Sequence, residues 1–525
     1  CRRLDGLPLA LELAAARVKL LPPQAILSRL DDQLKLLTGG ARDLPTRHQT
    51  LRNTLEWSYS LLNDDEKKLY AHLGVFVSGF TLEAAETVCN PENKLNILDG
   101  LTALVDNSLL RQEEMPDGEF RFSMLETIRA YAVERLNESG EADALHAGHA
   151  QYFGNIIMNE AGRGIYSPKS LQWLTWYERE LDNIRATLNW CLAAPRGSQL
   201  GVGLIFMLFW FWYRRGHFIE GQQWAEKFLA VSDVQNTPPM NAMALASSGI
   251  LALWQGQQET ALTRLQEALA IQQRLENDQM MGMTQMANGI AFINMGRDSE
   301  AQPLLEQAGR FFMEAGMPYF HALTLVHLGN AELGLGHPEK AHEYHSRAEA
   351  AARQVNENWL ISFALNNLGE VARVQGQYDV ARKYYEECEA LLPDSGDKGD
   401  RARFVHSLGY IAQHEGNHDH AEDQFRRSLR MFRRLGNRRG MAECMAGLAG
   451  VKARKGDALW GAAMLSAAES VLKVTGGAWW PADRAEVERN QEFIRSALSE
   501  AEFMAAQKKG QAMSLEQALT FASES

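Results

Sequence analysis

The feature that most constrains the fold of this chain is a repeat of 40 residues in its second half. Glycines recur at this spacing, each in a short polar stretch between two helical patterns: Gly216, Gly256, Gly296, Gly336, Gly376, Gly416 and Gly456. A second small residue stands seven positions before each turn, from Gly249 to Ala449, and a third stands five positions after it, from Ala261 to Gly461. A fixed period of this length indicates stacked helix pairs that bury a continuous core. The sequence therefore predicts an all-α solenoid over residues 241–480.

The same repeat places a large side chain nine residues after most of the turns. These side chains are Leu265, Leu305, Tyr385, Phe425 and Leu465. One repeat carries His345 there instead. Because the distance between packed helices depends on the side chains at their contact, small residues facing large ones favour a close approach of the paired helices.

The first 137 residues lack this period and indicate two smaller units. Residues 1–52 are helical and rich in Leu and Ala, with turns predicted at Pro22-Pro23 and Gly39-Gly40. Residues 53–137 form the second unit. Its predicted helices cover about 51–62, 64–73, 82–88 and 94–107.

A change of periodicity follows the last of these helices. Residues 109–112 and 119–122 alternate in polarity around the turn tetrapeptide Met115-Pro116-Asp117-Gly118, which predicts one β-hairpin. Three helices and a hairpin make a winged helix. Residues 138–240 are expected to be a helical linker with a first atypical repeat, and residues 481–525 to be C-terminal capping helices.

Composition excludes several functional classes. Asp and Glu exceed Lys and Arg by 66 − 53 = 13, so the chain as a whole does not attract nucleic acid or an anionic membrane. The longest apolar run, about 12 residues, is shorter than the roughly 20 of a membrane-spanning helix. Five scattered cysteines without a C-x-x-C pair favour free thiols and a cytoplasmic location. The chain begins at Cys1 without an initiator Met, so we expect it to be part of a longer polypeptide.

Two further patterns suggest chemistry. His414-Glu-Gly-Asn-His418 matches the zinc-protease pattern H-E-x-x-H, but Gly416 is a periodic turn glycine, so we expect a solvated turn and no metal. A basic stripe could contact nucleic acid or an acidic domain, or could be an outward face paired with neighbouring acids. The stripe consists of Arg426, Arg427, Arg430, Arg433, Arg434, Arg438 and Arg439.

The 40-residue pattern resembles the tetratricopeptide repeat. That repeat normally has 34 residues. The six extra residues would lengthen both helices by nearly a turn, as in the long-helix variety of bacterial regulatory ATPases. The resemblance implies a right-handed solenoid whose first helices line a concave groove.

Motifs outside the repeats extend the resemblance. Gly6-Leu7-Pro8-Leu9-Ala10 is similar to the lid-helix motif of the STAND or NB-ARC class of signal-transduction ATPases. Residues 124–132, Met-Leu-Glu-Thr-Ile-Arg-Ala-Tyr-Ala, look like the motif that closes the winged helix of this class. With Phe-Trp-Tyr-Arg-Arg-Gly-His at 211–217 and Met-Ser-Leu-Glu-Gln-Ala at 513–518, they resemble a bacterial branch that joins such an ATPase to a tetratricopeptide sensor, often in transcriptional regulators.

This resemblance implies a nucleotide lid. Pro8 would pack near the adenine of ADP, with Gly6 and Leu7 shaping the turn. Leu125, followed by Glu126, stands where eukaryotic relatives carry a His that touches the β-phosphate, and leucine cannot donate that hydrogen bond. Residues 1–52 would be only a remnant of the lid.

The phosphate-binding loop G-x-x-x-x-G-K-[S/T] is missing, since no Gly-Lys dipeptide occurs. No nucleophile elbow or paired-carboxylate pattern appears either. We therefore expect no enzyme activity and no cofactor in this chain. ADP or ATP with magnesium is expected in the intact parent.

The resemblance also implies which side chains face the groove. If the first helices begin at residues 242, 282, 322, 362 and 402, positions 2, 5, 6, 9 and 12 of each point inward, and the groove runs from apolar to polar. The predicted ligand groove consists of Asn330, Phe363, Asn366, Asn367, Glu370, Arg373, Arg403, His406 and Tyr410. It could hold an extended peptide, with Arg373 or Arg403 binding a carboxylate. The alternative is that these residues only pack neighbouring helices.

These observations predict the sensor portion of a STAND-type regulator. A peptide, protein or small-molecule inducer would bind in the groove and act on the lid, while the ATPase and output domains lie elsewhere. The alternative is a constitutive interaction scaffold without nucleotide switching. A DNA-binding role ranks last, because the predicted helix 82–88 carries Glu83 and Glu86 but no Lys or Arg.

Overall fold

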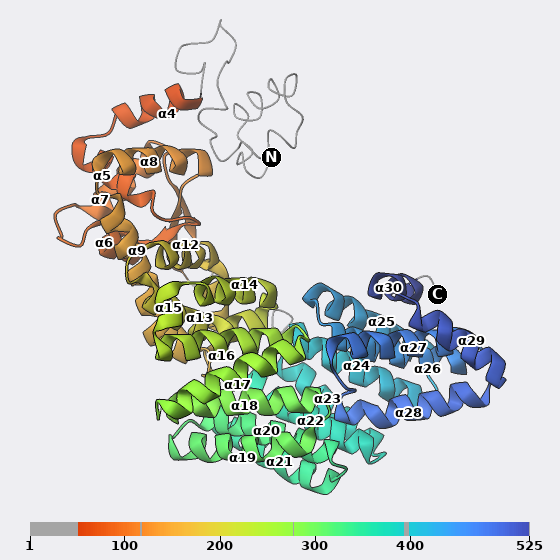
Figure 1. Cartoon of the computed structure of the whole chain (residues 1–525). Helices are drawn as coiled ribbons and strands as arrows, with labels where there is room; N and C mark the ends of the chain where they lie inside the picture. Colours follow the sequence, from red (N-terminus) through yellow and green to blue (C-terminus); the bar gives the residue numbers. More distant parts are fainter. Residues whose placement is uncertain (1–50, 116–117, 277, 393–397, 524–525) are drawn as a thin grey trace, which may run out of the picture. The chain divides into compact units, whose positions relative to one another are not determined.

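The computed structural model describes residues 51–115, 118–276, 278–392 and 398–523 (Figure 1). The chain divides into two compact units. The first contains the described residues up to Ile157 together with Trp176–Gly197, and the second contains Met158–Thr175 and the residues from Ser198 onward. The predicted lid motif Gly6-Leu7-Pro8 lies outside the described residues.

The first unit combines helices with a small sheet. Its elements are α4 (Leu51–Ser60), α5 (Asp64–Leu73), β1 (Phe80–Thr81), α6 (Leu82–Cys89), α7 (Ile97–Asp106), β2 (Arg111–Glu114), β3 (Phe120–Ser123), α8 (Glu126–Ser139), α9 (Ala142–Ile156) and α12 (Leu181–Ala193). Polar N-caps start three of these helices, because their side chains accept hydrogen bonds from free backbone N–H groups. Asn63 forms a capping box with Glu66, Thr81 caps α6, and Asn96 caps α7.

The predicted β-hairpin is present as β2 and β3, which pair antiparallel with Gln112 opposite Phe122. The sheet also contains the two-residue strand β1, in the order β1-β3-β2, which the sequence did not predict. Phe80 of β1 lies opposite Phe122, and their rings stack at 6.0 Å. Two residues are too few to show an alternating pattern, so this strand depends on its tertiary contact.

Helix α12 completes the first unit through buried polar contacts. The Asn183 side chain accepts a hydrogen bond from the Val77 backbone at 2.9 Å and donates one to the Gly79 carbonyl at 3.0 Å. It also donates to Glu180 at 2.8 Å, and Glu180 forms a buried ion pair with Arg121 of β3. These contacts satisfy backbone groups that the loop before β1 would otherwise leave unpaired.

The second unit is helical. The segment between α9 and α12 contains η4 (Ile157–Ala161), α10 (Gly162–Gly164) and α11 (Ser170–Arg179). The helices before the repeats are α13 (Gly197–Arg215), α14 (Phe218–Leu229) and α15 (Ser232–Asn236). The repeats comprise α16 (Pro238–Trp254), α17 (Gln258–Arg274), α18 (Asp278–Asn294), α19 (Asp298–Glu314), α20 (Pro318–Gly334), α21 (Pro338–Val355), α22 (Asn358–Val374), α23 (Tyr378–Leu391), α24 (Lys398–His414), α25 (His418–Leu435), α26 (Arg438–Arg454) and α27 (Ala458–Thr475). The predicted all-α fold with a winged helix and a tetratricopeptide-like solenoid is confirmed.

The periodic glycines form the turns inside the repeats. All seven have φ between +72° and +100°, the left-handed region that side chains with a Cβ avoid. A second turn at the same period, between repeats, also adopts positive φ at Gly316, Asn356 and Gly436. The first helices of the repeats begin directly after these second turns, at residues 238, 278, 318, 358 and 398. Two of them begin with a proline, Pro238 and Pro318, a residue that favours the first helical position. The predicted starts were four residues too late.

The small residues permit close approach of the paired helices. A Cβ added at Gly289 would lie 2.6 Å from Leu305, and one at Gly369 would lie 2.5 Å from Tyr385. His345 occupies the same place in its repeat, because a Cβ at Gly329 would lie 2.4 Å from its ring. The substituted position therefore keeps its packing role.

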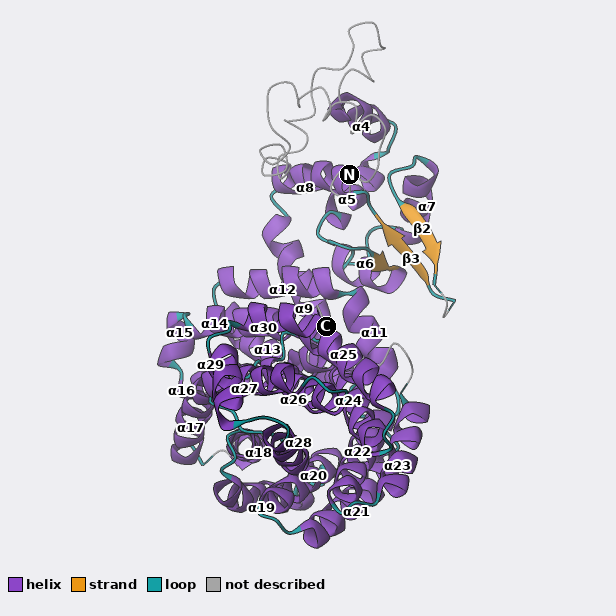
Figure 2. Ribbon diagram, turned by 90° about the vertical axis from the view of Figure 1, so that its right-hand side faces the viewer, coloured by secondary structure: helices purple, strands orange, loops and turns teal. Residues whose placement is uncertain are grey.

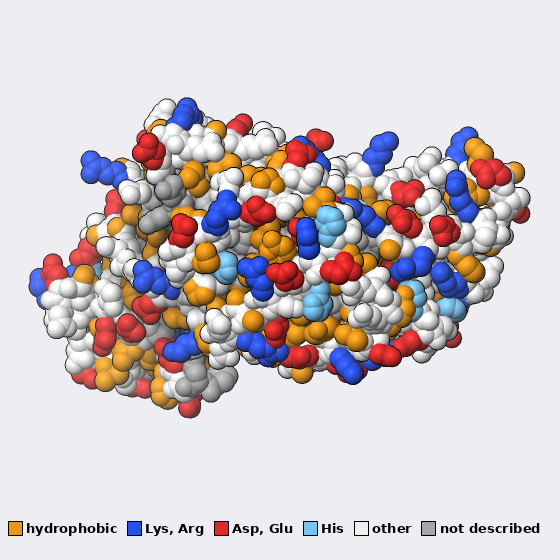
Figure 3. Space-filling model, turned by 90° about the horizontal axis from the view of Figure 1, so that it is seen from below, with side chains coloured by type: hydrophobic (Ala, Val, Ile, Leu, Met, Phe, Trp, Pro, Cys, Tyr) orange, Lys and Arg blue, Asp and Glu red, His pale blue; other side chains and the backbone are white. Residues whose placement is uncertain are grey.

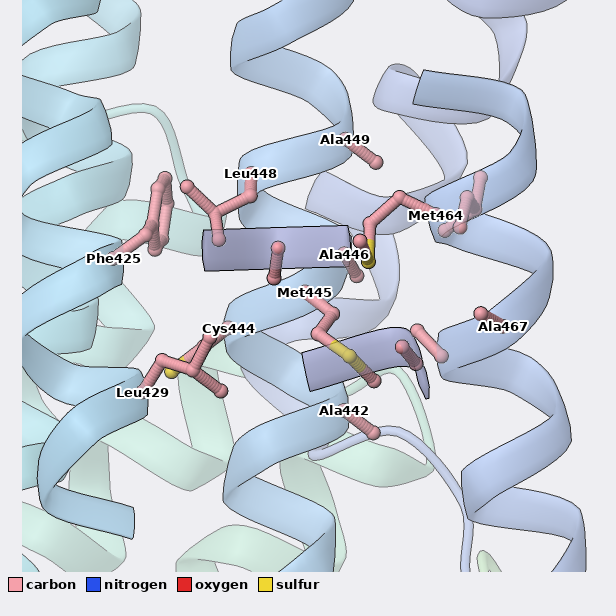
Figure 4. Packing of buried hydrophobic residues seen from close by; sticks show 14 of the residues in the cluster. Phe425, Leu429, Ala442, Cys444, Met445, Ala446, Leu448, Ala449, Met464 and Ala467 are labelled. Carbon is pink, nitrogen blue, oxygen red and sulfur yellow. The ribbon is translucent and has the colours of Figure 1, made fainter. Parts of the chain in front are cut away.

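Near the end of the solenoid, α25, α26 and α27 share an apolar core (Figure 4). Phe425 and Leu429 of α25 pack against the Ala-rich helix α26, and Met464 of α27 packs from the other side. Three further helices follow: α28 (Pro481–Ser496), α29 (Glu500–Gln511) and α30 (Leu515–Ser523). No helix of the described residues is long and apolar enough to cross a membrane.

The helices after the solenoid occupy two different places. α29 and α30 pack against α27, the last helix of the repeats. α28 instead contacts α20, α22, α26 and α27, and Figure 2 shows it inside the ring of repeat helices. Only part of the segment predicted to cap the solenoid therefore lies at its end.

His345 generates a prediction about stability. Burial lowers the pKa of His345 to about 3, and neither ring nitrogen has a hydrogen-bond partner among the described residues. Because the unfolded chain binds a proton near pH 6.5, stability is lost as the pH falls from about 6.5 towards 3. We expect His345→Leu to raise the free energy of unfolding by about 1–3 kcal/mol at neutral pH and to reduce this loss in acid.

Thermal and denaturant unfolding followed by circular dichroism at several pH values would measure both effects. His342→Leu, an exposed substitution on the same helix, is the matched control and should change stability by less than about 0.5 kcal/mol. A destabilised His345→Leu variant would contradict the packing equivalence of the repeats.

Candidate functional site

The inner face of the solenoid is formed by the first helices of the repeats, and α28 lies across it. Most buried helix faces in this unit are apolar, but α28 buries Asp483, Glu486 and Asn490, each at most 1 % exposed. These residues stand at positions i, i+3 and i+7, so they lie on one side of the helix. Buried ionised groups require charged or hydrogen-bonding partners, and the inner face supplies them.

Asp483 is the centre of this polar contact. Its carboxylate accepts hydrogen bonds from Arg373 Nη2 at 2.6 Å, Arg403 Nη1 at 3.1 Å and His406 Nε2 at 3.1 Å. Burial by itself would raise the pKa of Asp483, but His406, Arg373 and Arg403 hold that pKa well below its usual range. Asp483 is therefore a carboxylate at neutral pH, bound by two neighbouring first helices.

Glu486 and Asn490 continue the contact along α28. Glu486 lies 3.0 Å from His414 Nε2, and burial, which would raise its pKa, is outweighed by His414 and Arg373, which lower it. Asn490 accepts hydrogen bonds from Gln413 at 2.9 Å and from Arg454 at 2.8 Å. Gly450 of α26 allows this approach, because a Cβ there would lie 2.1 Å from the Asn490 side chain.

Trp480, immediately before α28, is held between two guanidinium groups. The ζ carbons of Arg403 and Arg439 each lie 4.9 Å from the centre of its ring, a favourable cation–π arrangement. Its indole N–H donates to Glu370 at 2.6 Å. Burial raises the pKa of Glu370, while Arg403 acts in the opposite direction.

A cavity of about 120 Å³ lies beside Trp480. Its lining includes Asn366, Asn367, Glu370, Arg403 and Arg439. A side-chain oxygen on each asparagine and Nη2 of Arg439 have no hydrogen-bond partner among the described residues. Buried polar atoms are normally satisfied by protein, water or ligand, whereas the residues that line this cavity include unsatisfied polar groups.

An apolar wall adjoins this cavity. Side chains from α13, α16, α18, α20 and α22 line it: Trp210, Trp254, Met283, Met286, Ile290, Leu323, Trp359 and Phe363. Trp210 meets Trp359 edge to face at 5.0 Å, and Tyr213 Oη lies 3.5 Å from Asp400. α13 therefore closes the groove on one side, and the groove changes from apolar to polar along its length.

The residues predicted for the groove are brought together with one exception. Phe363, Asn366, Asn367, Glu370 and Arg403 line the cavity, Arg373, Arg403 and His406 bind α28, and Tyr410 lies under Arg373 with 4.8 Å between its ring centre and the guanidinium carbon. Asn330 is buried on α20, and its amide has no hydrogen-bond partner in the described part of the chain. The predicted role of these residues in binding a ligand stays a prediction.

The two predicted lid residues within the described chain lie at the start of α8. Leu125 is the N-cap residue of this helix and packs against the core of the first unit. Glu126 begins α8 and pairs with Arg129 at 3.0 Å. A nucleotide role for either residue stays a prediction.

Sequence reasoning missed the residues of the site outside the repeat register. Asp483 and Glu486 come from the segment predicted to be a cap, and Trp480 is the last residue of the predicted solenoid. Trp210 and Tyr213 come from a helix before the clearest repeats. The sequence did contain a signal for α28. Asp483 and Glu486 are three residues apart on one helix face, so their negative charges could pair with the two arginines predicted to point into the groove. The apolar wall had no comparable signal, since a buried aromatic helix usually belongs to a core.

The H-E-x-x-H pattern forms a turn. His414 ends α24 and stacks on Tyr378 at 4.1 Å, Gly416 has a φ of +75°, and His418 begins α25. Among the described residues, no group of three or more His, Cys, Asp or Glu could hold a metal ion.

The basic stripe of α25 is partly paired. Arg426 lies 3.0 Å from Glu422, and Arg433 lies 3.1 Å from Glu516 of α30. On the face drawn in Figure 3, acidic and basic side chains are interspersed. The pairing supports the outward-face interpretation for the stripe residues of α25. For Arg439 of α26 that interpretation is wrong, because this side chain is buried and pairs with Glu443.

The winged helix lacks a cationic reading helix. Neither α6 nor α7 contains Lys or Arg, and α7 carries Asp99 and Asp106. The one arginine of β3, Arg121, is buried against Glu180. A helix with this charge would repel the phosphates of DNA.

Comparison with known proteins identifies two domains. A family model described as a winged helix-turn-helix domain matches residues 62–137, which contain α5 to α7 and most of α8. A tetratricopeptide repeat model matches residues 320–394, which contain most of α20 and all of α21 to α23. The chain therefore contains a winged helix-turn-helix domain and tetratricopeptide repeats.

Curated relatives come from mycobacteria. A Mycobacterium tuberculosis protein provisionally named as the HTH-type transcriptional regulator Rv0890c is 36 % identical over 280 residues, 52 % of this chain and 31 % of the relative. The uncharacterized protein Rv0894 of the same organism is 41 % identical over 155 residues, 29 % of this chain and 39 % of that protein. The chain thus spans about a third of the length of these relatives.

Solved structures with a similar course of the chain share little sequence identity with this protein. A STAND protein with a tetratricopeptide repeat sensor from Pyrococcus horikoshii is 16 % identical, covers 98 % of this chain and 74 % of its own, and has a TM-score of 0.44. A Rap protein complexed with competence and sporulation factor is 15 % identical, covers 70 % of this chain and 99 % of its own, and has a TM-score of 0.45.

The buried ion pairs generate the next prediction. Arg373→Met would leave the buried Asp483 and Glu486 with one partner fewer, and breaking such a pair costs about 3–5 kcal/mol. Arg382→Met is the matched control, because Arg382 pairs with Glu415 at the surface and loss of that pair should cost about 0–1 kcal/mol. Denaturant unfolding would measure both, and equal losses would contradict a stabilising role for the Arg373 contact.

Proposed function

We propose that this chain is the regulatory and sensor portion of a STAND-type signal-transduction ATPase of the transcriptional-regulator class. In this proposal the solenoid groove binds an inducer, and the winged helix belongs to a nucleotide lid. The observation that carries the proposal is the inner face itself, where Arg403, Arg439 and two asparagines surround a cavity beside an aromatic wall.

The groove also contains buried polar atoms that a ligand with polar groups could satisfy. Here the oxygens of Asn366 and Asn367 and Nδ1 of His327 remain without a partner in the described chain. Burial lowers the pKa of His327 to about 3, so its ring is neutral and can accept a hydrogen bond through Nδ1. These atoms favour a site for an inducer with polar groups.

In the intact parent, ADP or ATP with magnesium would be held by residues outside this chain, with Pro8, Gly6 and Leu7 contributing to the lid. The inducer would shift the population towards an open state only as far as its affinities for the two states differ. The four described cysteines, which are free thiols, suit the proposed cytoplasmic location.

The proposal is tested by calorimetric titration of ADP into this chain and into the longer parent protein that carries a phosphate-binding loop. We expect binding only by the longer protein, with an affinity that falls at least tenfold in Pro8→Ala because the adenine contact is lost. Pro22→Ala, a proline outside the lid motif, is the control and should bind as the unaltered protein does. Absence of nucleotide binding by the longer protein would overturn the switch and leave the constitutive scaffold.

A further inference from the structure

Helix α28 has features of a bound ligand. It buries the polar residues Asp483, Glu486 and Asn490 against the inner face, and it also buries Val487 and Ile494 in the apolar core of α26 and α27. Its partners come from α22, α24 and α26, so one helix bridges several repeats. This arrangement differs from the nearest-neighbour packing that builds a solenoid.

The fit of α28 to the inner face is incomplete. The hydroxyl of Tyr410, Oε1 of Gln413 and Nδ2 of Asn490 are buried without a hydrogen-bond partner among the described residues. Each such atom costs about 1–3 kcal/mol relative to a satisfied one. A helix of the same length that made hydrogen bonds to these groups would therefore bind this face more tightly than α28 does.

The charge of the inner face also points to an acidic ligand. Without α28 and Trp480, the inner-face arginines Arg373, Arg403 and Arg439 would keep Glu370, Glu443 and Asp298 as acidic neighbours, and Asp298 would lose its ion pair with Arg484 of α28. His406 and His414 add further donors to carboxylates. This cationic surface lies inside a chain with a net charge of −13, so the ligand is selected by local and not by overall charge.

Both connections of α28 lead to the last repeat helix, α27. Gly476 and Gly477 connect it to α27, Gly476 with a φ of +65°, and the following helix α29 packs back on α27. Both ends are thus tethered near the same helix. A tethered segment competes with an external ligand at an effective concentration of about millimolar.

We infer that α28 is a displaceable internal ligand and that the inner face binds an acidic helical segment of a partner protein. The segment would carry the pattern shown by this chain, Trp-x-x-Asp-x-x-Glu-x-x-x-Asn, from Trp480 to Asn490. The inference deepens the proposed function, because it names the ligand class of the same groove.

The test uses the full chain with Asp483→Arg and Glu486→Arg, which places like charges opposite the arginines and histidines and expels α28. The probe is a fluorescent peptide with the sequence of residues 478–497, followed by anisotropy. We expect this variant to bind the peptide at least tenfold more tightly than the unaltered chain. Peptide carrying the same two substitutions should not bind.

The matched control is the full chain with Glu488→Arg and Glu492→Arg, the same charge change on the exposed side of α28. This variant should bind the peptide no better than the unaltered chain. Equal affinity in all three proteins would overturn the inference. Light scattering that showed dimers of the expelled variant, formed by exchange of α28, would also overturn it by assigning the site to a second copy.

A second measurement needs no variant and remains decisive where the expelled chain fails to fold. In hydrogen exchange of the unaltered protein, we expect the amides of α28 to exchange at least tenfold faster than those of α26 and α22, because α28 opens alone. Protection equal to that of α26 would overturn the inference. No nucleotide enters these measurements, so their failure is distinguishable from failure of the nucleotide switch.

Discussion

The close approach of paired helices at one small residue per repeat is the contact on which the second unit depends. Gly249, Gly289, Gly329, Gly369 and Gly409 each face a large side chain at a distance that a Cβ would not permit. Because the contact recurs every 40 residues, successive first helices are presented in one orientation. This regularity places Arg373 and Arg403, thirty residues apart on different helices, close enough to bind one carboxylate.

Much of this arrangement is readable from the sequence, because it repeats. The turn glycines, the opposing small and large residues and the inward positions of α22 and α24 all follow from the period. Most of the predicted inward residues lie at the cavity or against α28 although the helices begin four residues earlier than predicted, since the period fixes the register of a helix face and not the ends of the helices. The hairpin of the winged helix was readable for a similar reason, because its strands alternate around a turn tetrapeptide.

What the sequence did not predict depends on contacts between segments without a shared period. Strand β1 exists because Phe80 meets Phe122, and nothing in two residues signals this pairing. The docking of α28 depends on a tertiary match between Asp483 and residues about 80 to 110 positions earlier. His345 departed from the apolar pattern, yet its ring occupies the place in its repeat that Leu305 occupies in the preceding one. The shape of the side chain therefore decided the packing, and its polarity affects only the free energy of unfolding.

The same docking sets what the groove can hold. Small-molecule sites usually have about 300–1,000 Å³, whereas the cavity beside Trp480 has about 120 Å³. Trp480 fills the polar end between Arg403 and Arg439, and α28 covers the arginines beyond it. With α28 in place, only a small polar group fits. A larger ligand must therefore take the place of α28, and binding such a ligand and releasing this helix become one event.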